Sequence, residues 1–231
     1  MAGPPMNPLD FDALKKTFDA DGFVVIESYL SAGEVSEMRS RLSTFRANVD
    51  GWQEDFRNAG AVKGLDRYDD WYRDYLVEGR QIPLMKHLLE DDLAPDNVTW
   101  IDKPQGVKRT MPHYDAIGSY LSPPSGISLW IALDPIDLRN GCLHYERGSH
   151  KRDKTFPLRD YDERNLSAVP VEAEPGDAVV HSALTVHWSG VREEYRPRNA
   201  MVFVYWGASS KDESAFAKRS RSGYARRRVT V

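Results

Sequence analysis

The stretch GISLWIALDPIDLRNGCLHYE, residues 126–146, decides the fold class. It contains two runs rich in Ile, Leu, Trp and Tyr, and the turn-forming cluster RNG separates them. Similar runs lie on both sides of it, as NVTWID at 97–102, DAVVHSALTVHWSG at 177–190 and NAMVFVYW at 199–206. Several short strands punctuated by Gly, Pro and Asn clusters are typical of an antiparallel sandwich or barrel. We therefore predict a β core over about residues 97–207.

The part of the chain before this core, about residues 1–95, has mainly helical patterns. Apolar side chains recur at helical spacing over 11–21, and a glycine follows directly. FVVIESY at 23–29 is β-branched and aromatic, so it predicts one strand. Ser31, with a glutamate three residues later, has the pattern of a helix N-cap. A further helix is expected near 79–92, so the predicted fold is mainly β with N-terminal helices.

No internal repeat and no low-complexity linker divides the chain. We therefore expect one domain over residues 1–231, ending in a basic tail at about 211–231. The tail has two interpretations: a solvated end of the chain, or a contact to a partner or an anionic substrate.

Composition narrows the function classes. The chain has 231 residues and a net charge of −4 at pH 7, so no overall basic field favours nucleic acid or an anionic membrane. No apolar run approaches the length of a bilayer span, and the N-terminus lacks the charge order of a signal peptide. The single cysteine, Cys142, permits neither an internal disulfide nor a Cys-rich zinc site. We expect a cytoplasmic protein whose partner is a small molecule; the oligomeric state stays open.

The first chemical signal is the pair His113 and Asp115 in MPHYDAIGSY, residues 111–120. In an extended segment, side chains two residues apart point to the same face. An imidazole and a carboxylate aimed at one point suit a metal, but they also suit a plain His–Asp hydrogen bond. The metal interpretation therefore needs a third ligand from elsewhere in the chain.

Two histidines compete for that role, His181 and His187. They are six residues apart, so a regular strand would place both on the same face and parity does not choose between them. The residues that follow His187 favour it: Trp-Ser-Gly signals a strand end, and Arg198 comes eleven residues later, at the start of an apolar strand. His181 is then expected not to be needed for iron binding. The remaining histidines are interpreted as structural or surface residues: His87, His144 and His150.

An arginine next to an apolar strand is rarely buried without an anionic partner. Beside a His–Asp pair, Arg198 indicates that a carboxylate ligand binds there, with Arg196 as a rival for the same role. Two neutral histidines and one carboxylate form the facial triad of non-haem Fe(II) oxygenases. An arginine held some distance away suits the second carboxylate of 2-oxoglutarate.

Three separated blocks then carry a family resemblance: HYD at 113–115, WIALDPIDLRNGCLHYERGSHK at 130–151 and PGDAVVHSALTVHWSGVREEYRPR at 175–198. Together they resemble the phytanoyl-CoA dioxygenase family, over roughly residues 98–206. The opening FDADGFVVIESYLSAGEVSEMR at 18–39 is similar to the usual start of that family. The resemblance implies a double-stranded β-helix, or jelly roll, that uses Fe(II), 2-oxoglutarate and O2.

Carried over position by position, the resemblance implies the iron ligands His113, Asp115 and His187. It implies the 2-oxoglutarate contacts Arg198, Ser189 and Trp130, although core packing is an alternative role for the tryptophan. Halogenating relatives replace the acidic ligand with a small residue, so the presence of Asp115 favours oxygenation.

The implied activity is hydroxylation of a C–H bond with release of succinate and CO2. The substrate is expected to be a small anionic or zwitterionic metabolite. Lys103, Lys108 and Arg109, with the aromatic stretch at 52–75, could form its pocket, or they could be ordinary surface charges. Two other classes stay open: a metal-binding jelly roll without oxygenase activity, and a cupin-like isomerase or hydrolase.

Overall fold

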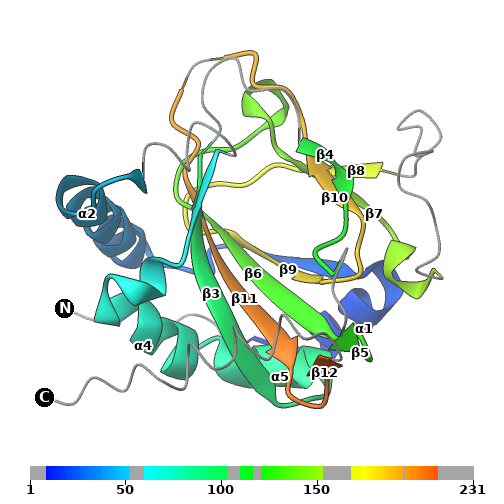
Figure 1. Ribbon diagram of the computed structural model, residues 1–231. Coiled ribbons are helices and arrows are strands. Elements are labelled where there is room, and N and C mark those ends of the chain that lie inside the picture. Colours follow the sequence, from blue (N-terminus) through cyan, green and yellow to red (C-terminus); the bar gives the residue numbers. More distant parts are fainter. Residues whose placement is uncertain are drawn as a thin grey trace, which may run out of the picture.

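A computed structural model describes residues 9–52, 60–102, 110–116, 121–152, 168–194 and 196–212. Two antiparallel sheets face each other, and helices cover the outer face of the larger one (Figure 1). The prediction of a mainly β fold with N-terminal helices is confirmed. Among the described residues, no helix combines the length and the apolar character needed to cross a membrane.

The larger sheet has six strands in the order β1-β9-β6-β11-β3-β2. Its strands are β1 (Phe23–Ile26), β2 (Ala61–Lys63), β3 (Leu93–Ile101), β6 (Gly126–Ala132), β9 (Ala178–Ser182) and β11 (Ala200–Gly207). Every neighbouring pair in it is antiparallel. β1, the first strand along the chain, pairs with β9 from the C-terminal part of the described chain.

The smaller sheet has four strands in the order β4-β10-β7-β8. They are β4 (Thr110–His113), β7 (Leu143–Glu146), β8 (Ala168–Val171) and β10 (His187–Ser189). A short pair, β5 (Leu121–Ser122) and β12 (Lys211–Asp212), forms a separate ribbon. The two facing sheets form the predicted jelly roll.

The helices begin and end where the sequence provides caps. In α1 (Phe11–Asp21), Asp10 accepts a hydrogen bond from the backbone of Ala13, and Gly22 ends the helix in a left-handed conformation. In α2 (Ala32–Asn48), Ser31 and Glu34 form the expected capping box. The other long helices are α4 (Asp70–Glu78) and α5 (Ile82–Leu89), and three short 3-10 turns are η1 (Leu65–Arg67), η2 (Leu138–Asn140) and η3 (Ser149–Lys151).

Alternation along β11 shows how the strands divide the core. Met201, Phe203 and Tyr205 pack into the cluster between the large sheet and the helices. Ala200 and Val202 pack into a second cluster between the two sheets. Because successive side chains point to opposite faces, one apolar strand supplies both layers. The candidate site lies on the inner face, between the sheets.

Several boundaries differ from those expected. β1 ends at Ile26 rather than at residue 29, because Ser28 has a positive φ of 51° and turns the chain. The single helix expected near 79–92 is α5 alone, with α4 ending just before Gly79. β3 begins at Leu93, before the run that predicted it.

Candidate active site

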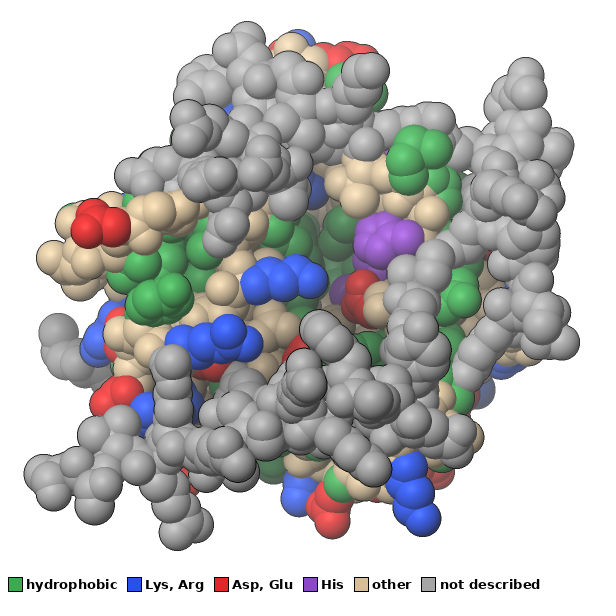
Figure 2. Space-filling model, viewed as in Figure 1, with side chains coloured by type: hydrophobic (Ala, Val, Ile, Leu, Met, Phe, Trp, Pro, Cys, Tyr) green, Lys and Arg blue, Asp and Glu red, His purple; other side chains and the backbone are tan. Residues whose placement is uncertain are grey.

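A cavity of about 300 Å³ lies between the inner faces of the two sheets. Figure 2 shows it as a hollow in which histidine and acidic side chains are visible. Its wall includes all six residues that the sequence pointed to: His113, Asp115, Trp130, His187, Ser189 and Arg198. His87, His144 and His150 do not line it. Lys103, Lys108 and Arg109 lie outside the described residues, as does most of the basic tail.

Three candidate metal ligands meet because two short strands pair. His113 ends β4, and it lies opposite His187, which begins β10. Asp115 follows β4 by two residues. One ligand atom from each of these residues lies within 4.8 Å of the others. The separation suits three side chains around one ion.

The two histidine rings are held in the orientation that a metal ligand needs. His113 Nδ1 lies 2.9 Å from the carbonyl oxygen of Met111, and His187 Nδ1 lies 3.0 Å from that of Thr185. Since a carbonyl only accepts, each Nδ1 carries the proton and each Nε2 keeps its lone pair. This is the hydrogen bonding that fixes a ligating imidazole, so the residues present fit a divalent metal such as iron(II).

Electrostatics give two of the three groups, His187 and Asp115, the charges that this role requires. Burial lowers the pKa of His187 to about 3, so its ring is neutral at pH 7. Burial disfavours the ionised form of Asp115, but His187, His181 and His113 outweigh it and hold the pKa of this carboxyl well below its usual range. The site therefore offers one carboxylate and neutral imidazole, which is the donor set of the facial triad.

His181 and His187 lie in different sheets, because the chain turns between them. His181 belongs to β9 in the large sheet, whereas His187 belongs to β10 in the small one. His181 Nε2 lies 3.1 Å from Asp115 Oδ2, and the hydroxyl of Tyr145 lies 3.1 Å from His181 Nδ1. Ser128 donates to the same Asp115 oxygen at 3.0 Å.

These contacts make His181 a partner of the carboxylate rather than a member of the triad. Burial raises the pKa of Tyr145 well above its usual value, so its hydroxyl keeps its proton and donates to His181. His181 then donates from Nε2 to Asp115. The sequence offered no signal for this contact, because it depends on two sheets meeting at one side chain. It gives a reason to revise the expectation that His181 does not affect iron binding.

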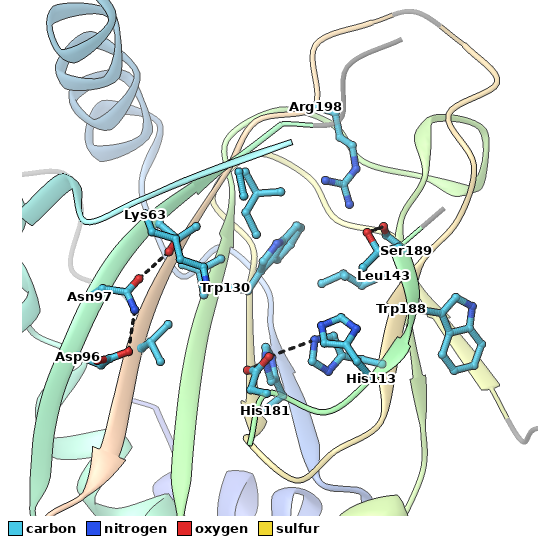
Figure 3. Close-up of a pocket in the computed structure, with 18 of the residues that line it drawn as sticks. Lys63, Asp96, Asn97, His113, Trp130, Leu143, His181, Trp188, Ser189 and Arg198 are labelled. Atoms are coloured by element: carbon cyan, nitrogen blue, oxygen red, sulfur yellow. Dashed lines mark hydrogen bonds and ion pairs between the residues drawn. The ribbon is translucent and has the colours of Figure 1, made fainter. Parts of the chain in front are cut away.

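Arg198 is the buried cation that the sequence suggested. It is 2% exposed, it lies two residues before the start of β11, and its Nε donates to the carbonyl of Gly141 at 2.9 Å. Burial lowers its pKa to about 10, which leaves the guanidinium charged at pH 7. No carboxylate of the described residues forms an ion pair with it. A buried charge of this kind calls for an anionic partner, and its head points into the cavity (Figure 3).

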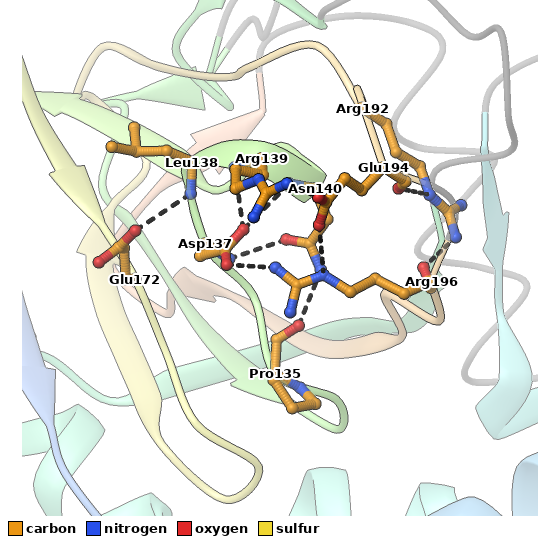
Figure 4. A network of polar contacts seen from close by, with 9 residues as sticks. All are labelled: Pro135, Asp137, Leu138, Arg139, Asn140, Glu172, Arg192, Glu194 and Arg196. Atoms are coloured by element: carbon orange, nitrogen blue, oxygen red, sulfur yellow. Dashed lines mark hydrogen bonds and ion pairs between the residues drawn. The ribbon is translucent and has the colours of Figure 1, made fainter.

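Arg196, the alternative anchor, forms ion pairs outside the cavity. Arg196 forms ion pairs with Asp137 and Glu194 in the loop network of Figure 4. Asp137 also accepts from the backbone of Arg139 and Asn140. Arg196 does not line the cavity, so the geometry favours Arg198 over Arg196 as an anchor for an anion.

Ser189 and Trp130 flank the space in front of Arg198 (Figure 3). Ser189 is buried on β10, and its hydroxyl donates to that of Thr110 at 2.9 Å. Trp130 is buried on the cavity face of β6. A carboxylate between them would meet a cation and hydroxyls at one end and an aromatic wall beside it.

Opposite the histidines lies a polar wall that the sequence analysis missed. Lys63 of β2 and Asp96, Asn97 and Thr99 of β3 line the same cavity. The polar letters in LAPDNVT were a visible signal for this wall, but their direction depends on an irregularity in β3.

Known proteins resemble this chain over the part of the sequence that forms the site. The family model for phytanoyl-CoA dioxygenase (PhyH) matches residues 18–198, a range that contains the triad and Arg198. The chain belongs to the phytanoyl-CoA dioxygenase family. This confirms the resemblance found in the sequence. Iron and 2-oxoglutarate, the cofactors expected from the sequence, are those of this group of oxygenases.

Three proteins illustrate what the chain is similar to, two by sequence and one by solved structure. Phytanoyl-CoA dioxygenase 1 of Oryza sativa subsp. japonica is 26% identical, over 80% of this chain and 85% of its own. Methylphosphonate hydroxylase of Gimesia maris is 24% identical, over 94% and 89%. The solved structure of the epimerase SnoN with Fe3+, alpha ketoglutarate and nogalamycin RO is 24% identical, with a TM-score of 0.74 over 89% and 88%. This last similarity confirms the fold.

Proposed function

We propose that the protein is a hydroxylase in which His113, Asp115 and His187 bind iron(II). Arg198, Ser189 and Trp130 hold 2-oxoglutarate, with the arginine paired to the carboxylate distant from the metal. The observation that carries the proposal is the combination, in one cavity, of a three-ligand cluster and a buried guanidinium that forms no ion pair with any described residue. A structural His–Asp contact alone needs no such arginine.

When bound, iron(II) and 2-oxoglutarate supply the oxidising power for attack on a C–H bond, with release of succinate and CO2. The chain's own part is to hold the ligands in fixed orientations and to keep water away. His187 is neutral and its Nδ1 proton is held by Thr185, so it does not serve as an acid or a base. Val202 and Leu143 give the cavity an apolar side.

The substrate class is a small anionic or zwitterionic metabolite. Lys63 supports this, because it lines the cavity and adds positive charge apart from Arg198. The cavity of about 300 Å³ suits a compact molecule next to 2-oxoglutarate. The relationship to a methylphosphonate hydroxylase is consistent with a small anion.

A second outcome is favoured by one specific observation, the similarity to the SnoN epimerase. Removal of a hydrogen from carbon can end in epimerisation instead of hydroxylation on the same fold. Once a substrate is found, labelled O2 separates the two: hydroxylation puts the label into the product, whereas epimerisation leaves the product mass unchanged.

The test of the proposal is succinate formation by the purified protein with Fe(II), 2-oxoglutarate, ascorbate and O2. Slow succinate release is expected without any added substrate. Replacement of His113, Asp115 or His187 by Ala should lower it at least about 100-fold, in the range typical for loss of an essential group. His87→Ala, outside the cavity, is the matched control and should retain full activity. Succinate release that survives all three triad substitutions would contradict the proposal.

A further inference from the structure

Strand β3 contains an irregularity that turns a carboxylate into the cavity. Along the β3–β11 ladder, Asn97 lies opposite Val204, but Pro95 lies opposite Tyr205. Two residues of β3 thus span one step of β11, which makes Asp96 the extra residue of a β-bulge.

The bulge changes the direction of Asp96. Val98 and Trp100 point into the core under the helices, and Asn97 and Thr99 point into the cavity. Strict alternation would place Asp96 on the core side, with Val98. Instead, Asp96 and Asn97 are consecutive residues that both line the cavity. Bulges occur next to active sites because they re-aim a side chain in this way.

The carboxylate of Asp96 is held in place by a short relay of hydrogen bonds. The hydroxyl of Thr99 donates to Asn97 Oδ1 at 2.6 Å, and Asn97 Nδ2 donates to Asp96 Oδ2 at 2.7 Å. Figure 3 shows both bonds along the strand, across the cavity from His113. Asp96 Oδ1 has no hydrogen-bond partner among the described residues. One oxygen of this cavity-lining carboxylate is thus held by the relay, and the other has no partner among the described residues.

The surroundings of Asp96 suit a cation. Among the described residues no Lys or Arg forms an ion pair with Asp96. Trp206 lines the cavity from β11, on the same face as Val204. An aromatic ring in the same cavity offers an ammonium group a second favourable contact. If this side of the cavity only had to be polar, a neutral side chain would be sufficient in place of the carboxylate of Asp96.

We propose that Asp96, oriented by Asn97, forms a subsite for a protonated amino group of the substrate. This inference rests on the proposed function and narrows it, since it selects a zwitterionic substrate over a purely anionic one. The ammonium group pairs with Asp96, and the anionic end of the molecule lies toward Lys63. A charge-assisted hydrogen bond in a partly enclosed site is among the stronger polar contacts.

The test uses two probes that differ only in the amine, 5-aminopentanoate and pentanoate. Each is titrated by calorimetry into the full chain, once metal-free and once loaded anaerobically with Fe(II) and 2-oxoglutarate. The amine should tighten binding about 10- to 100-fold, as expected for a charged hydrogen bond. Asp96→Asn should bind the two probes with about equal affinity, and Asp96→Glu should retain part of the preference for the amine.

Asp70→Asn is the matched control, because it removes the same charge from an exposed position on α4. It should leave the amine preference unchanged. A preference that persists in Asp96→Asn, equal binding of the two probes to the natural chain, or no binding of either would overturn the inference. The iron–2-oxoglutarate absorption band, recorded in the same samples, judges the proposed function separately. An amine preference lost in Asp96→Asn supports the subsite even where that band is missing.

Discussion

Asp115 has two oxygens with different partners. Oδ1 lies 3.6 Å from His187 Nε2, on the side of the triad. Oδ2 receives hydrogen bonds from His181 and Ser128. The second oxygen is therefore held by the protein, which leaves the first for a metal. A ligand whose orientation is fixed in this way binds a metal more tightly.

We predict that His181→Ala weakens Fe(II) binding about 10- to 100-fold, the usual effect of losing a partner of a metal ligand. Tyr145→Phe should cost less, because it removes only the bond that holds His181. Equilibrium titration of the metal-free protein measures both, with His87→Ala as the control. Unchanged affinity in His181→Ala would mean that Ser128 alone orients Asp115. Complete loss would instead make His181 a ligand.

Cys142 is a second residue whose environment makes a prediction. It is fully buried between the sheets, and burial raises the pKa of its thiol to about 11. The thiolate is the reactive form, so at pH 8 only about one thiol in a thousand is reactive. Labelling by a disulfide reagent at pH 8 should therefore be at least about 100-fold slower in the native protein than in urea. Rapid labelling of the native state would show that the inner core opens readily.

At the scale of elements, the end of α1 is fixed to the loop between β9 and β10. Gly22 has φ of 85°, its carbonyl accepts from the hydroxyl of Thr185, and a Cβ on it would collide with His150 and Thr185. This contact holds the first helix against the turn that separates the two competing histidines.

Gly22→Ala should lower the free energy of unfolding by about 2–4 kcal/mol, from left-handed backbone strain together with overpacking. Gly51→Ala is a matched control, because Gly51 has nearly the same φ of 83° but has nothing within 4 Å of an added Cβ. It should cost only about 1 kcal/mol. Urea denaturation measures both. Equal costs would show that the close approach at Gly22 is relieved by movement of its neighbours.

Elements with strong local signals could be predicted from the sequence. The capping box at Ser31 and the glycine after α1 are local features, and both lie where expected. β2 could not be predicted, since three residues carry too little pattern. The bulge at Asp96 could not be predicted from the sequence either, because it is defined by the register of β3 against β11.

The same distinction applies to the candidate site: local sequence features could be predicted, and features that depend on the tertiary fold could not. The pair His113 and Asp115, and Arg198 at the start of an apolar run, could be predicted from the order of residues along the chain. The roles assigned to them stay predictions. The separation of His181 from His187 could not be read, because a turn, not a regular strand, joins them.

At the scale of the whole molecule, the site joins the two sheets. His113 and His187 come from the small sheet, whereas the side chains that hold Asp115 come from β9 and β6 of the large one. A metal bound to Asp115 is therefore linked to both layers. The prediction that the entire chain is one domain stays a prediction.

This linkage predicts that metal stabilises the fold. Binding at 100 times the dissociation constant adds about 2.7 kcal/mol to the free energy of unfolding, so Co(II), a stable substitute for iron(II), should raise Tm by several degrees. A chelator should reverse the rise, and His187→Ala should lack it while His87→Ala keeps it. A Tm that is indifferent to Co(II) in the natural chain would argue that the three ligand atoms do not hold an ion.

The proposed function requires that one cavity bind iron through the triad and 2-oxoglutarate through Arg198. Its most direct test is an anaerobic titration of the metal-free protein with Fe(II) and then 2-oxoglutarate, followed by visible absorption. We expect a charge-transfer band that needs both additions, and a higher 2-oxoglutarate requirement in Arg198→Ala at unchanged iron affinity. Iron that binds without any band on addition of 2-oxoglutarate would contradict it and would favour a metal-binding jelly roll without oxygenase chemistry.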